Sequence, residues 1–259
     1  MSIWALSDPH LSFGSNKPMD VFGEQWADHP ALIEAHWRAC VADEDTVLMP
    51  GDISWGMNFH EALPDLAFID SLPGQKIIGR GNHDYWWNSL TKLDRFAEDN
   101  GLHSLRFIRH NAIKVENVVV ANTRGWILPD DRDFTEQDDK IYKRELIRLR
   151  LSLEEGRKMR EDGDAFLITL HYPPLGPAGK STEITDMLQE YGVTACIYGH
   201  VHGRNPYASF NAVHEGISYK NTACDLLGFK PLLLYGEGTD DCLPYFRSKG
   251  YNETKLSEA

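Results

Sequence analysis

Five short polar motifs carry the residue types that bind metal ions and move protons. They are Asp8-Pro9-His10, Gly51-Asp52, Gly81-Asn82-His83-Asp84, His171 and Gly199-His200-Val201-His202. Five of the eleven histidines of the chain lie in these motifs, so the search for a site starts there. Each motif follows a segment that we expect to be a β-strand. Ligand sites in α/β proteins gather at the carboxyl ends of strands, which favours one shared site.

The donor atoms of these motifs suit borderline divalent ions. Carboxylates, one amide oxygen and several imidazoles, without a thiolate, favour Mn, Fe, Co, Ni or Zn over Ca or Mg. The candidate ligands are Asp8, His10, Asp52, Asn82, His171, His200 and His202. They exceed what one tetrahedral ion uses, and their number fits two ions that share one carboxylate. Such a pair keeps a net positive charge, attracts phosphate and lowers the pKa of water toward about 7.

Local backbone signals accompany two of the motifs. Pro9 disfavours a helix at Asp8, and we expect it to hold the Asp-x-His step extended. Gly199 and Gly203 flank the last motif and allow a tight turn that lets both imidazoles reach neighbouring ions.

Each motif also has a purely structural explanation when it is taken alone. Asp8 could be a turn carboxylate, Asp52 a helix N-cap, and His171 a satisfied core histidine. These explanations become jointly improbable because all the motifs occur in one order, each near the end of a predicted strand. The combined pattern therefore favours a metal site.

The ordered motifs resemble those of the calcineurin-like metallophosphoesterase superfamily, and they span Asp8 to His202. The flanking segments, residues 51–55, 82–87 and 123–126, resemble a bacterial branch of predicted phosphohydrolases. The resemblance implies an α/β fold, specifically a four-layer α/β/β/α sandwich with two mixed β-sheets. It also implies a cofactor of two divalent transition-metal ions, with Mn, Fe or Zn as the expected choices.

The resemblance further implies a role for each motif residue. Asp8, His10 and His202 would hold one ion, and Asn82, His171 and His200 the other. Asp52 would bridge the two ions. His83 would face the phosphate as a catalytic group, and Asp84 would support the His83 ring by fixing its tautomer and orientation.

The elements that must position these residues read as one α/β domain over residues 1–259. Apolar runs rich in β-branched residues alternate with segments of helical period. The predicted strands are Ile3–Leu6, Thr46–Met49, Lys76–Ile78, Val118–Asn122, Ala165–Leu170, Thr194–Tyr198, Ile217–Asn221 and Leu232–Tyr235. A hairpin is predicted between residues 112–115 and 118–121.

Three helices are predicted from apolar periodicity. The first buries the face formed by Leu32, His36, Trp37, Cys40 and Val41. The second buries Leu90, Leu93, Phe96 and Ala97 before the stop signal Gly101. The third runs from about Gln137 to Arg160, with an apolar stripe of Tyr142, Leu146, Leu149 and Leu153. Its charged surface is expected to face water, with a partner-binding face as the alternative.

Substrate contacts are less sharply indicated than metal ligands. Arg204 and Arg124 are candidates for binding a phosphate oxygen, as is Lys180, and a surface salt bridge is the alternative for such residues. Trp55, Trp86, Trp87 and Trp126 lie near the motifs, and packing of loops onto the core is favoured over stacking on substrate. Residues 124–133 form either an ordered cover over a site or a solvated connection.

Composition limits the partners. The net charge of −13 makes binding to nucleic acid unfavourable, and no run reaches the roughly 20 apolar residues that span a bilayer. The opening residues lack the features of a signal peptide and are predicted to form a strand. The four cysteines form no CxxC motif and are expected to be buried thiols in a reducing, cytoplasmic compartment.

The sequence thus predicts a phosphoric ester hydrolase with a dinuclear metal centre and a small phosphorylated substrate. In the expected mechanism a hydroxide that bridges the metals attacks phosphorus in line. Phosphomonoesterase and phosphodiesterase activities both stay open, as does the oligomeric state. A metal-dependent nuclease and a non-catalytic protein-binding scaffold of the same fold are the alternatives. The scaffold is disfavoured because every expected ligand side chain is present.

Overall fold

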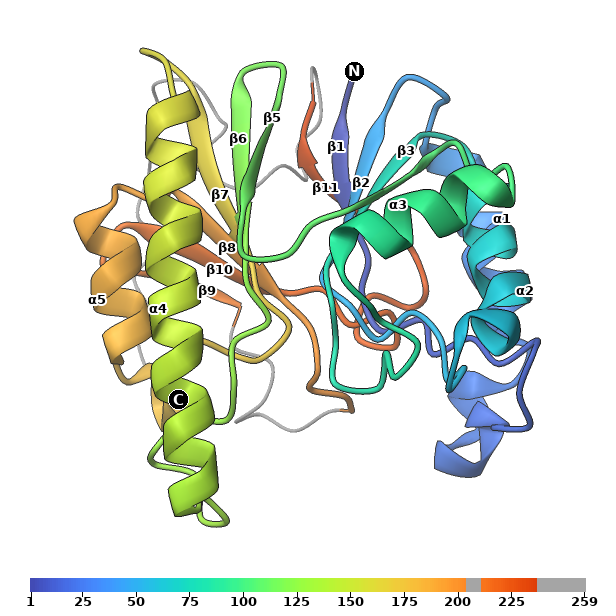
Figure 1. Cartoon of the computed structure of the whole chain (residues 1–259), viewed down its shortest axis with the longest axis horizontal. Coiled ribbons are helices and arrows are strands. Elements are labelled where there is room, and N and C mark those ends of the chain that lie inside the picture. The colour runs from blue at the N-terminus through green and yellow to red at the C-terminus, as the bar shows by residue number, and fades with distance from the viewer. Residues whose placement is uncertain (204–210, 237–259) are drawn as a thin grey trace.

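Two mixed β-sheets stacked face to face form the centre of the molecule (Figure 1). The computed structural model describes residues 1–203 and 211–236. The first sheet has the order β11-β1-β2-β3-β4, with β1 (Ile3–Ala5), β2 (Thr46–Met49), β3 (Gln75–Ile78), β4 (Leu105–Phe107) and β11 (Leu232–Tyr235). The second has the order β5-β6-β7-β8-β10-β9, with β5 (Ala112–Val115), β6 (Val118–Asn122), β7 (Ala165–Thr169), β8 (Ala195–Tyr198), β9 (Ala212–His214) and β10 (Ile217–Asn221).

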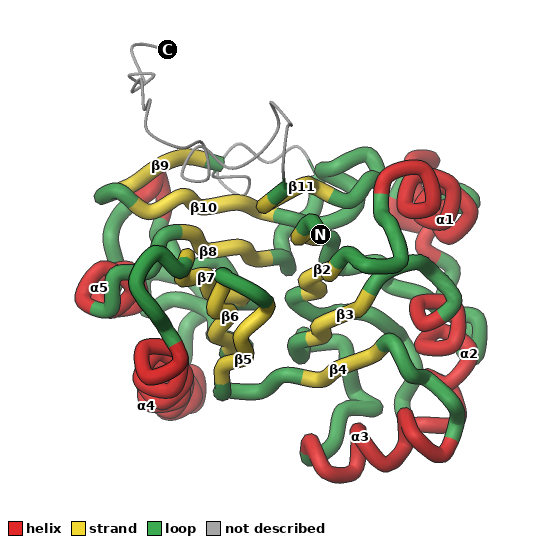
Figure 2. The backbone as a smooth tube through the Cα atoms, turned by 90° about the horizontal axis from the view of Figure 1, so that it is seen from above, coloured by secondary structure: helices red, strands yellow, loops and turns green. Residues whose placement is uncertain are grey.

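Helices cover the outer face of each sheet, as Figure 2 shows from above. The helices on the first sheet are α1 (His29–Cys40), α2 (Phe59–Asp70) and α3 (Leu90–Asp99). On the second sheet they are α4 (Glu136–Met159) and α5 (Glu183–Glu190). The 3-10 helices η1 (Met19–Phe22), η2 (Glu24–Trp26) and η3 (Pro177–Gly179) lie in connections. The expected four-layer α/β/β/α arrangement with two mixed sheets is confirmed.

Apolar side chains fill all three interfaces between the four layers. One buried cluster lies between the first sheet and its helices, a second between the other sheet and α4 and α5, and a third between the sheets. The third cluster includes Ile3, Leu48, Val120 and Leu167. Central strands are covered on both faces, which explains why β6 and β7 consist of continuous apolar runs rather than alternating ones.

The strands with continuous apolar sequences were predicted with bounds close to those observed. The hairpin of β5 and β6 is confirmed, with Ala112 paired to Ala121 and Val115 to Val118. Sequence reasoning missed β4 and β9, which are three residues long and carry too few apolar positions to show a period. It also missed α2, which contains Pro64, and α5, which is eight residues long and has Thr185 where the usual capping-box sequence has Glu or Gln.

The buried face of α1 agrees with the predicted one in part, since Trp37 and Val41 are buried as predicted. Leu32 is 40% exposed, whereas Ile33 and Trp37 are fully buried. Those two residues and His29 repeat every four positions, so the buried stripe lies one residue away from the line expected through Leu32, His36 and Cys40. The long helix α4 buries Tyr142, Leu149 and Leu153 as predicted, and its outer face is charged.

Parallel pairing brings the carboxyl ends of the strands to one edge. Strands β1, β2 and β3 run parallel to one another, and so do β6, β7 and β8. The loops that follow these strands gather below the sheets in Figure 1 and carry all five motifs. In residues 1–203 and 211–236, no helix has the length and apolar character needed to cross a lipid bilayer.

Candidate metal centre

The segment after β1 is held against the loop after β2 by backbone hydrogen bonds. The N–H of Asp8 donates to the carbonyl of Gly51 at 3.0 Å, and the N–H of His10 donates to the carbonyl of Asp52 at 3.1 Å. Asp8 and His10 have φ angles of 57° and 46°, in the left-handed region. The expectation that Pro9 holds this step extended is therefore wrong. The bonds to the neighbouring loop outweigh the local preference of a residue that precedes proline.

Left-handed backbone recurs among the predicted ligands. Asp52 and His200 also have positive φ angles, 53° and 71°. A residue with a Cβ in this region is strained, and such strain persists where surrounding structure enforces it, most often at functional sites. Four of the seven predicted ligands share this property.

Two glycines leave room for the buried carboxylates. A Cβ on Gly81 would overlap Oδ1 of Asp52, and a Cβ on Gly199 would overlap Oδ2 of Asp8. These glycines allow the loops to approach the carboxylates closely, which adds a second reason for the Gly-Asn-His-Asp and Gly-His-x-His sequences.

The structure brings the donor atoms into two overlapping groups. Asp8, His10 and His202 form one, and Asp8, Asp52 and His171 form the other; within each group the donor atoms lie within 4.8 Å of one another. Asp8 belongs to both groups, whereas Asp52 was predicted as the shared ligand. Oδ2 of Asp52 nevertheless lies between the groups, 3.8 Å from Nε2 of His10 and 3.4 Å from Nε2 of His171.

The remaining predicted ligands lie beside these groups. Oδ1 of Asn82 is 2.7 Å from Nε2 of His171. The His200 ring is 5.1 Å from the His171 ring, between centroids, and the His200 N–H donates to the Asp8 carboxylate. All seven predicted ligands thus meet at one edge of the two sheets, while the division between two ions stays a prediction.

The distances and hydrogen bonding fit a cation. Nε2 of His10 and Nε2 of His202 lie 3.1 Å apart, close to the roughly 3.3 Å that separates two ligand nitrogens when each is about 2.0–2.1 Å from one tetrahedral ion. Nδ1 of His171 is buried without a hydrogen-bond partner in the described residues, and it lies 4.0 Å from Oδ1 of Asp8. An orphaned nitrogen beside a buried carboxylate is what a metal-binding cluster leaves when protein atoms alone are counted.

The electrostatics of the site point the same way. Burial raises the pKa of Asp8 to about 6. Burial and the neighbouring carboxylates of Asp8 and Asp84 raise the pKa of Asp52 well above its usual value. Burial and the other imidazoles lower the pKa of His10 and of His171. Metal ligands must be deprotonated, so a divalent cation stabilises ionised carboxylates placed side by side together with neutral imidazoles.

His83 lies at the edge of this cluster rather than inside it. Its ring is 4.3 Å from the Trp55 ring and 5.6 Å from the His10 ring, and its Nδ1 is 3.5 Å from the Tyr85 hydroxyl. Its backbone N–H donates to Oδ1 of Asp52 at 2.8 Å, which fixes the residue beside the predicted bridging ligand. Burial lowers the pKa of the half-buried imidazole, so it is mainly neutral at pH 7.

The predicted contact between Asp84 and the His83 ring is wrong. The buried Asp84 carboxylate accepts bonds from the backbone N–H groups of residues 52, 53, 54 and 81 and from Nε1 of Trp86. These five donors occupy both oxygens. Asp84 therefore joins the loops after β2 and β3 and positions Asp52, instead of orienting the imidazole next to it.

Sequence reasoning missed two neighbours of the cluster. Oδ1 of Asp225 lies 2.9 Å from Nδ1 of His202, and Oδ2 accepts the Gly203 N–H. Burial opposes protonation of His202, but the bond to Asp225 and the charge of Asp8 outweigh it and raise the His202 pKa. Trp26 packs edge-on against His10 and His202. Neither residue lies in a motif, so only the folded structure reveals them.

The candidate substrate contacts have mixed outcomes. Arg204 lies outside the described residues. The Arg124 guanidinium lies 4.4 Å from the centre of the Trp126 ring, and its backbone carbonyl accepts the His171 and Tyr172 N–H groups. Lys180 forms an exposed salt bridge with Asp130 at 2.7 Å, the alternative considered for it. Trp86 and Trp87 are buried in the core, whereas Trp55 stacks on His10 at 5.0 Å.

The segment at residues 124–133 is neither fully packed nor fully solvated. Trp126 and Leu128 pack partly against the core beneath α4, and Nε1 of Trp126 donates to Asp138. The cysteines agree in part with expectation: Cys196 and Cys224 are buried free thiols, Cys40 is half-buried, and Cys242 lies outside the described residues.

Comparisons with known proteins provide a family context for this geometry. A family model described as calcineurin-like phosphoesterase matches residues 1–204. The Gene 66 protein of Mycobacterium phage L5 is 32% identical over 83 residues, which cover 31% of this chain and 39% of the phage protein. The chain thus spans about two fifths of that relative.

Solved structures share the fold at low sequence identity. The protein of unknown function AQ665 from Aquifex aeolicus has a TM-score of 0.50 and 15% identity, over 90% of this chain and 95% of that chain. TT1561 of Thermus thermophilus has a TM-score of 0.50 and 14% identity, over 90% of this chain and 97% of that chain. At these identities the likeness extends to the fold alone.

Proposed function

Because the chain belongs to the calcineurin-like phosphoesterase family, we propose that it hydrolyses phosphoric esters with two divalent transition-metal ions. Members of this family are metal-dependent phosphoesterase hydrolases. The observation that carries the proposal for this chain is the convergence of Asp8, Asp52 and His171 with His10 and His202 at one strand edge. The substrate is a small phosphorylated molecule, since the acidic chain disfavours long nucleic acids.

The residues divide into holding and reacting groups. Asp8, His10 and His202 would hold one ion, Asn82, His171 and His200 would hold the other, and Asp52 would be shared between them. When bound, such ions act as Lewis acids on phosphoryl oxygens and lower the pKa of water. Asp225 keeps Nδ1 of His202 protonated and thereby leaves Nε2 free to bind metal. The Asp84 carboxylate holds Asp52 in place by accepting the backbone N–H of Asp52.

His83 acts on the substrate. Its ring is half-buried at the margin of the cluster, and its Nδ1 lies near the Tyr85 hydroxyl. From this position the neutral ring can donate an N–H hydrogen bond to a phosphoryl oxygen or to the oxygen of the leaving group. Both phosphomonoesters and phosphodiesters suit this arrangement. The protein is proposed to act in the cytoplasm, where small phosphorylated metabolites and reduced thiols occur.

An activity and metal-content assay tests the proposal. Protein loaded with Mn, Fe or Zn should hydrolyse an activated aryl phosphate monoester or diester, lose this activity on chelation and regain it when metal returns. Elemental analysis should find about two ions per chain. His171→Ala should lose metal, whereas the control His60→Ala, on the exposed face of α2, should retain it. Undiminished hydrolysis by metal-free protein would refute the proposal.

A further inference from the structure

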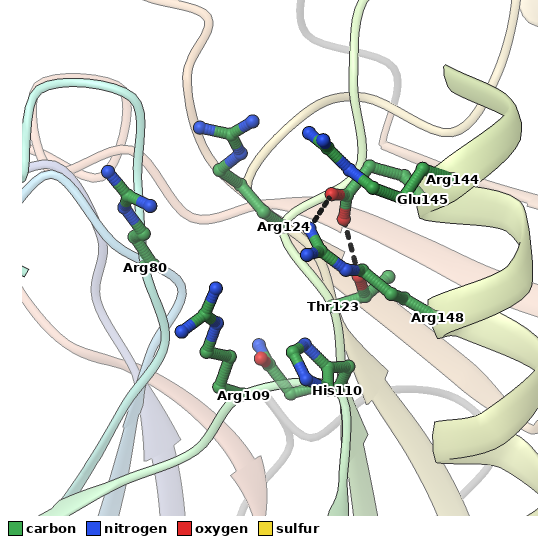
Figure 3. Close-up of a pocket in the computed structure, with 9 residues that line it drawn as sticks. Arg80, Arg109, His110, Thr123, Arg124, Arg144, Glu145 and Arg148 are labelled. Carbon is green, nitrogen blue, oxygen red and sulfur yellow. Dashed lines mark hydrogen bonds and ion pairs between the residues drawn. The ribbon is translucent and has the colours of Figure 1, made fainter. Parts of the chain in front are cut away.

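A strongly cationic pocket adjoins the candidate metal centre. It has a volume of about 230 Å³ and is surrounded by five arginines (Figure 3). Its lining residues are Arg80, Arg109, His110, Asn122, Thr123, Arg124, Arg144, Glu145 and Arg148. We call this the arginine pocket. It lies between the two sheets and α4, because its residues follow β3, β4 and β6 or belong to that helix.

The arginine pocket and the metal centre share a wall. Arg80 precedes the predicted ligand Asn82 by two residues, so their Cα atoms lie no more than about 7 Å apart. The carbonyl of Arg124 accepts the N–H of His171 at 3.0 Å. A ligand could therefore occupy both places at once.

The positive charge of the arginine pocket lacks a matching negative charge. Its one carboxylate belongs to Glu145, which bonds Arg148 at 2.6 Å and the Thr123 hydroxyl at 2.8 Å. Among residues 1–203 and 211–236, no ion pair involves Arg80, Arg109, Arg124 or Arg144. Nε of Arg80 is moreover buried without a hydrogen-bond partner there. At least four guanidinium groups are thus available to a ligand.

This arrangement is costly unless an anion binds. The chain carries a net charge of −13, yet five guanidinium groups converge on one small cavity. Burial lowers the pKa of Arg109, and the charges of Arg148 and Arg80 lower it further. Guanidinium groups form paired, charge-assisted hydrogen bonds with phosphate oxygens. The planar, forked arrangement of their N–H donors matches phosphate better than the compact ammonium group of a lysine does.

We propose that the arginine pocket binds a second phosphate group of the substrate, so that the preferred substrates carry two phosphate groups on one molecule. This inference rests on the proposed hydrolysis at the metal centre. One phosphate reacts there while the other is held by Arg80, Arg109 and Arg144. The volume supports a single charged group as the occupant, because cavities that enclose a whole drug-sized ligand measure about 300–1,000 Å³.

A specificity comparison tests the inference. Alkanediol bisphosphates of increasing chain length are compared with the matching alkyl monophosphates, using metal-loaded protein. One chain length should give a kcat/KM well above that of its monophosphate. In Arg109→Gln and in Arg144→Gln, this bisphosphate-to-monophosphate ratio should fall by about 10–100-fold, the loss expected for one charge-assisted bond. The control Arg106→Gln, an exposed arginine of β4 outside the pocket, should keep the ratio.

A binding measurement separates this inference from the proposed function. Alkane bisphosphonates and monophosphonates, which are not hydrolysed, are titrated into metal-loaded protein by calorimetry. Tighter binding of the bisphosphonate, lost in Arg109→Gln, supports the arginine pocket even if no ester is turned over. Equal binding of the two compounds, or an unchanged preference in both arginine variants, overturns the inference. Binding of inorganic phosphate at the pocket without any bisphosphonate preference overturns it as well, because the anion is then not part of the substrate.

Discussion

His83 differs in its surroundings from the four other histidines of the motifs. His10, His171 and His202 each have a ring nitrogen within 4.0 Å of Asp8 or Asp52, and His200 lies against the His171 ring. The His83 ring instead contacts Trp55 and approaches a tyrosine hydroxyl. Its backbone N–H, rather than its ring, contacts the carboxylate of Asp52, a predicted metal ligand. These contacts favour a role toward substrate over a role as ligand.

Replacing His83 tests this division. In His83→Asn, turnover of an aryl phosphate should fall by about 10²–10⁴-fold, because a proton donor or charge-stabilising group is lost. Metal content should stay near that of the wild type, since the backbone bond to Asp52 persists. Steady-state kinetics and elemental analysis measure the two effects. A variant that loses metal along with turnover would instead identify His83 as a ligand.

For single residues, the sequence predicts which side chains could bind metal better than it predicts which side chains touch one another. The types and order of the ligand residues were sufficient to indicate a metal site. The family resemblance implies a contact between Asp84 and the His83 ring, whereas the Asp84 carboxylate accepts hydrogen bonds from five other donors. Asp225 escaped notice since it is 23 residues from His202 and in no motif. The left-handed backbone at Asp8 arises from bonds to another loop.

At the scale of elements, buried carboxylates join the loops to the helices beneath them. Asp65 of α2 accepts the Phe13 N–H at 2.7 Å and the Ser54 hydroxyl, which ties the segments after β1 and β2 to the helix. Burial raises the pKa of Asp65 to about 6. Its proton is therefore bound more tightly in the folded chain than in the unfolded chain.

Asp65→Asn should remove one pH-dependent contribution to stability. In the wild type, the stability that Asp65 gives is full below its unfolded pKa of 3.8 and is lost as the pH rises through about 6. The amide can accept the Phe13 N–H and donate to the Ser54 hydroxyl oxygen, and it does not titrate. The free energy of unfolding of the variant minus that of the wild type should thus increase by about 1–3 kcal/mol between pH 4 and pH 7.

Urea unfolding of both proteins across this pH range, with metal removed beforehand, measures the difference. Asp94→Asn is a suitable control, because that residue lies on the exposed face of α3. A difference that stays constant with pH would contradict the raised pKa of Asp65.

Elements were predicted well where both faces of a strand are buried. The apolar runs of β2, β6 and β7 give strong signals because tertiary burial and local propensity agree. Short edge strands lack this agreement, which is why β4 and β9 were missed. The predicted face of α1 contains Trp37 correctly and Leu32 wrongly, because both Leu32 and Ile33 are apolar, and only packing against the first sheet decides between them.

At the scale of the whole molecule, the candidate metal centre joins the two halves of the sandwich. Asp8, Asp52 and Asn82 follow strands of the first sheet, whereas His171, His200 and His202 follow strands of the second. Each group of donor atoms contains residues from both sheets. Periodicity in the sequence shows neither how the sheets stack nor that both sheets contribute ligands to one site, because packing is a long-range property. The order of the layers was predicted from the family resemblance.

Metal binding should therefore stabilise the entire fold rather than one loop. At a free metal concentration of 100 times the Kd, binding of one ion adds about 2.7 kcal/mol to the free energy of unfolding. For a chain of this size, that corresponds to an increase in Tm of about 5–10 °C. Calorimetry of metal-loaded and chelated protein measures the shift. In His171→Ala, which removes a ligand contributed by the second sheet, the shift should be much smaller, whereas His60→Ala should retain it. Ions that bridge the two halves of a fold must be released when those halves separate, so their binding raises the Tm. If chelation left the wild-type Tm unchanged while activity was lost, the ions would act in catalysis without holding the two sheets together.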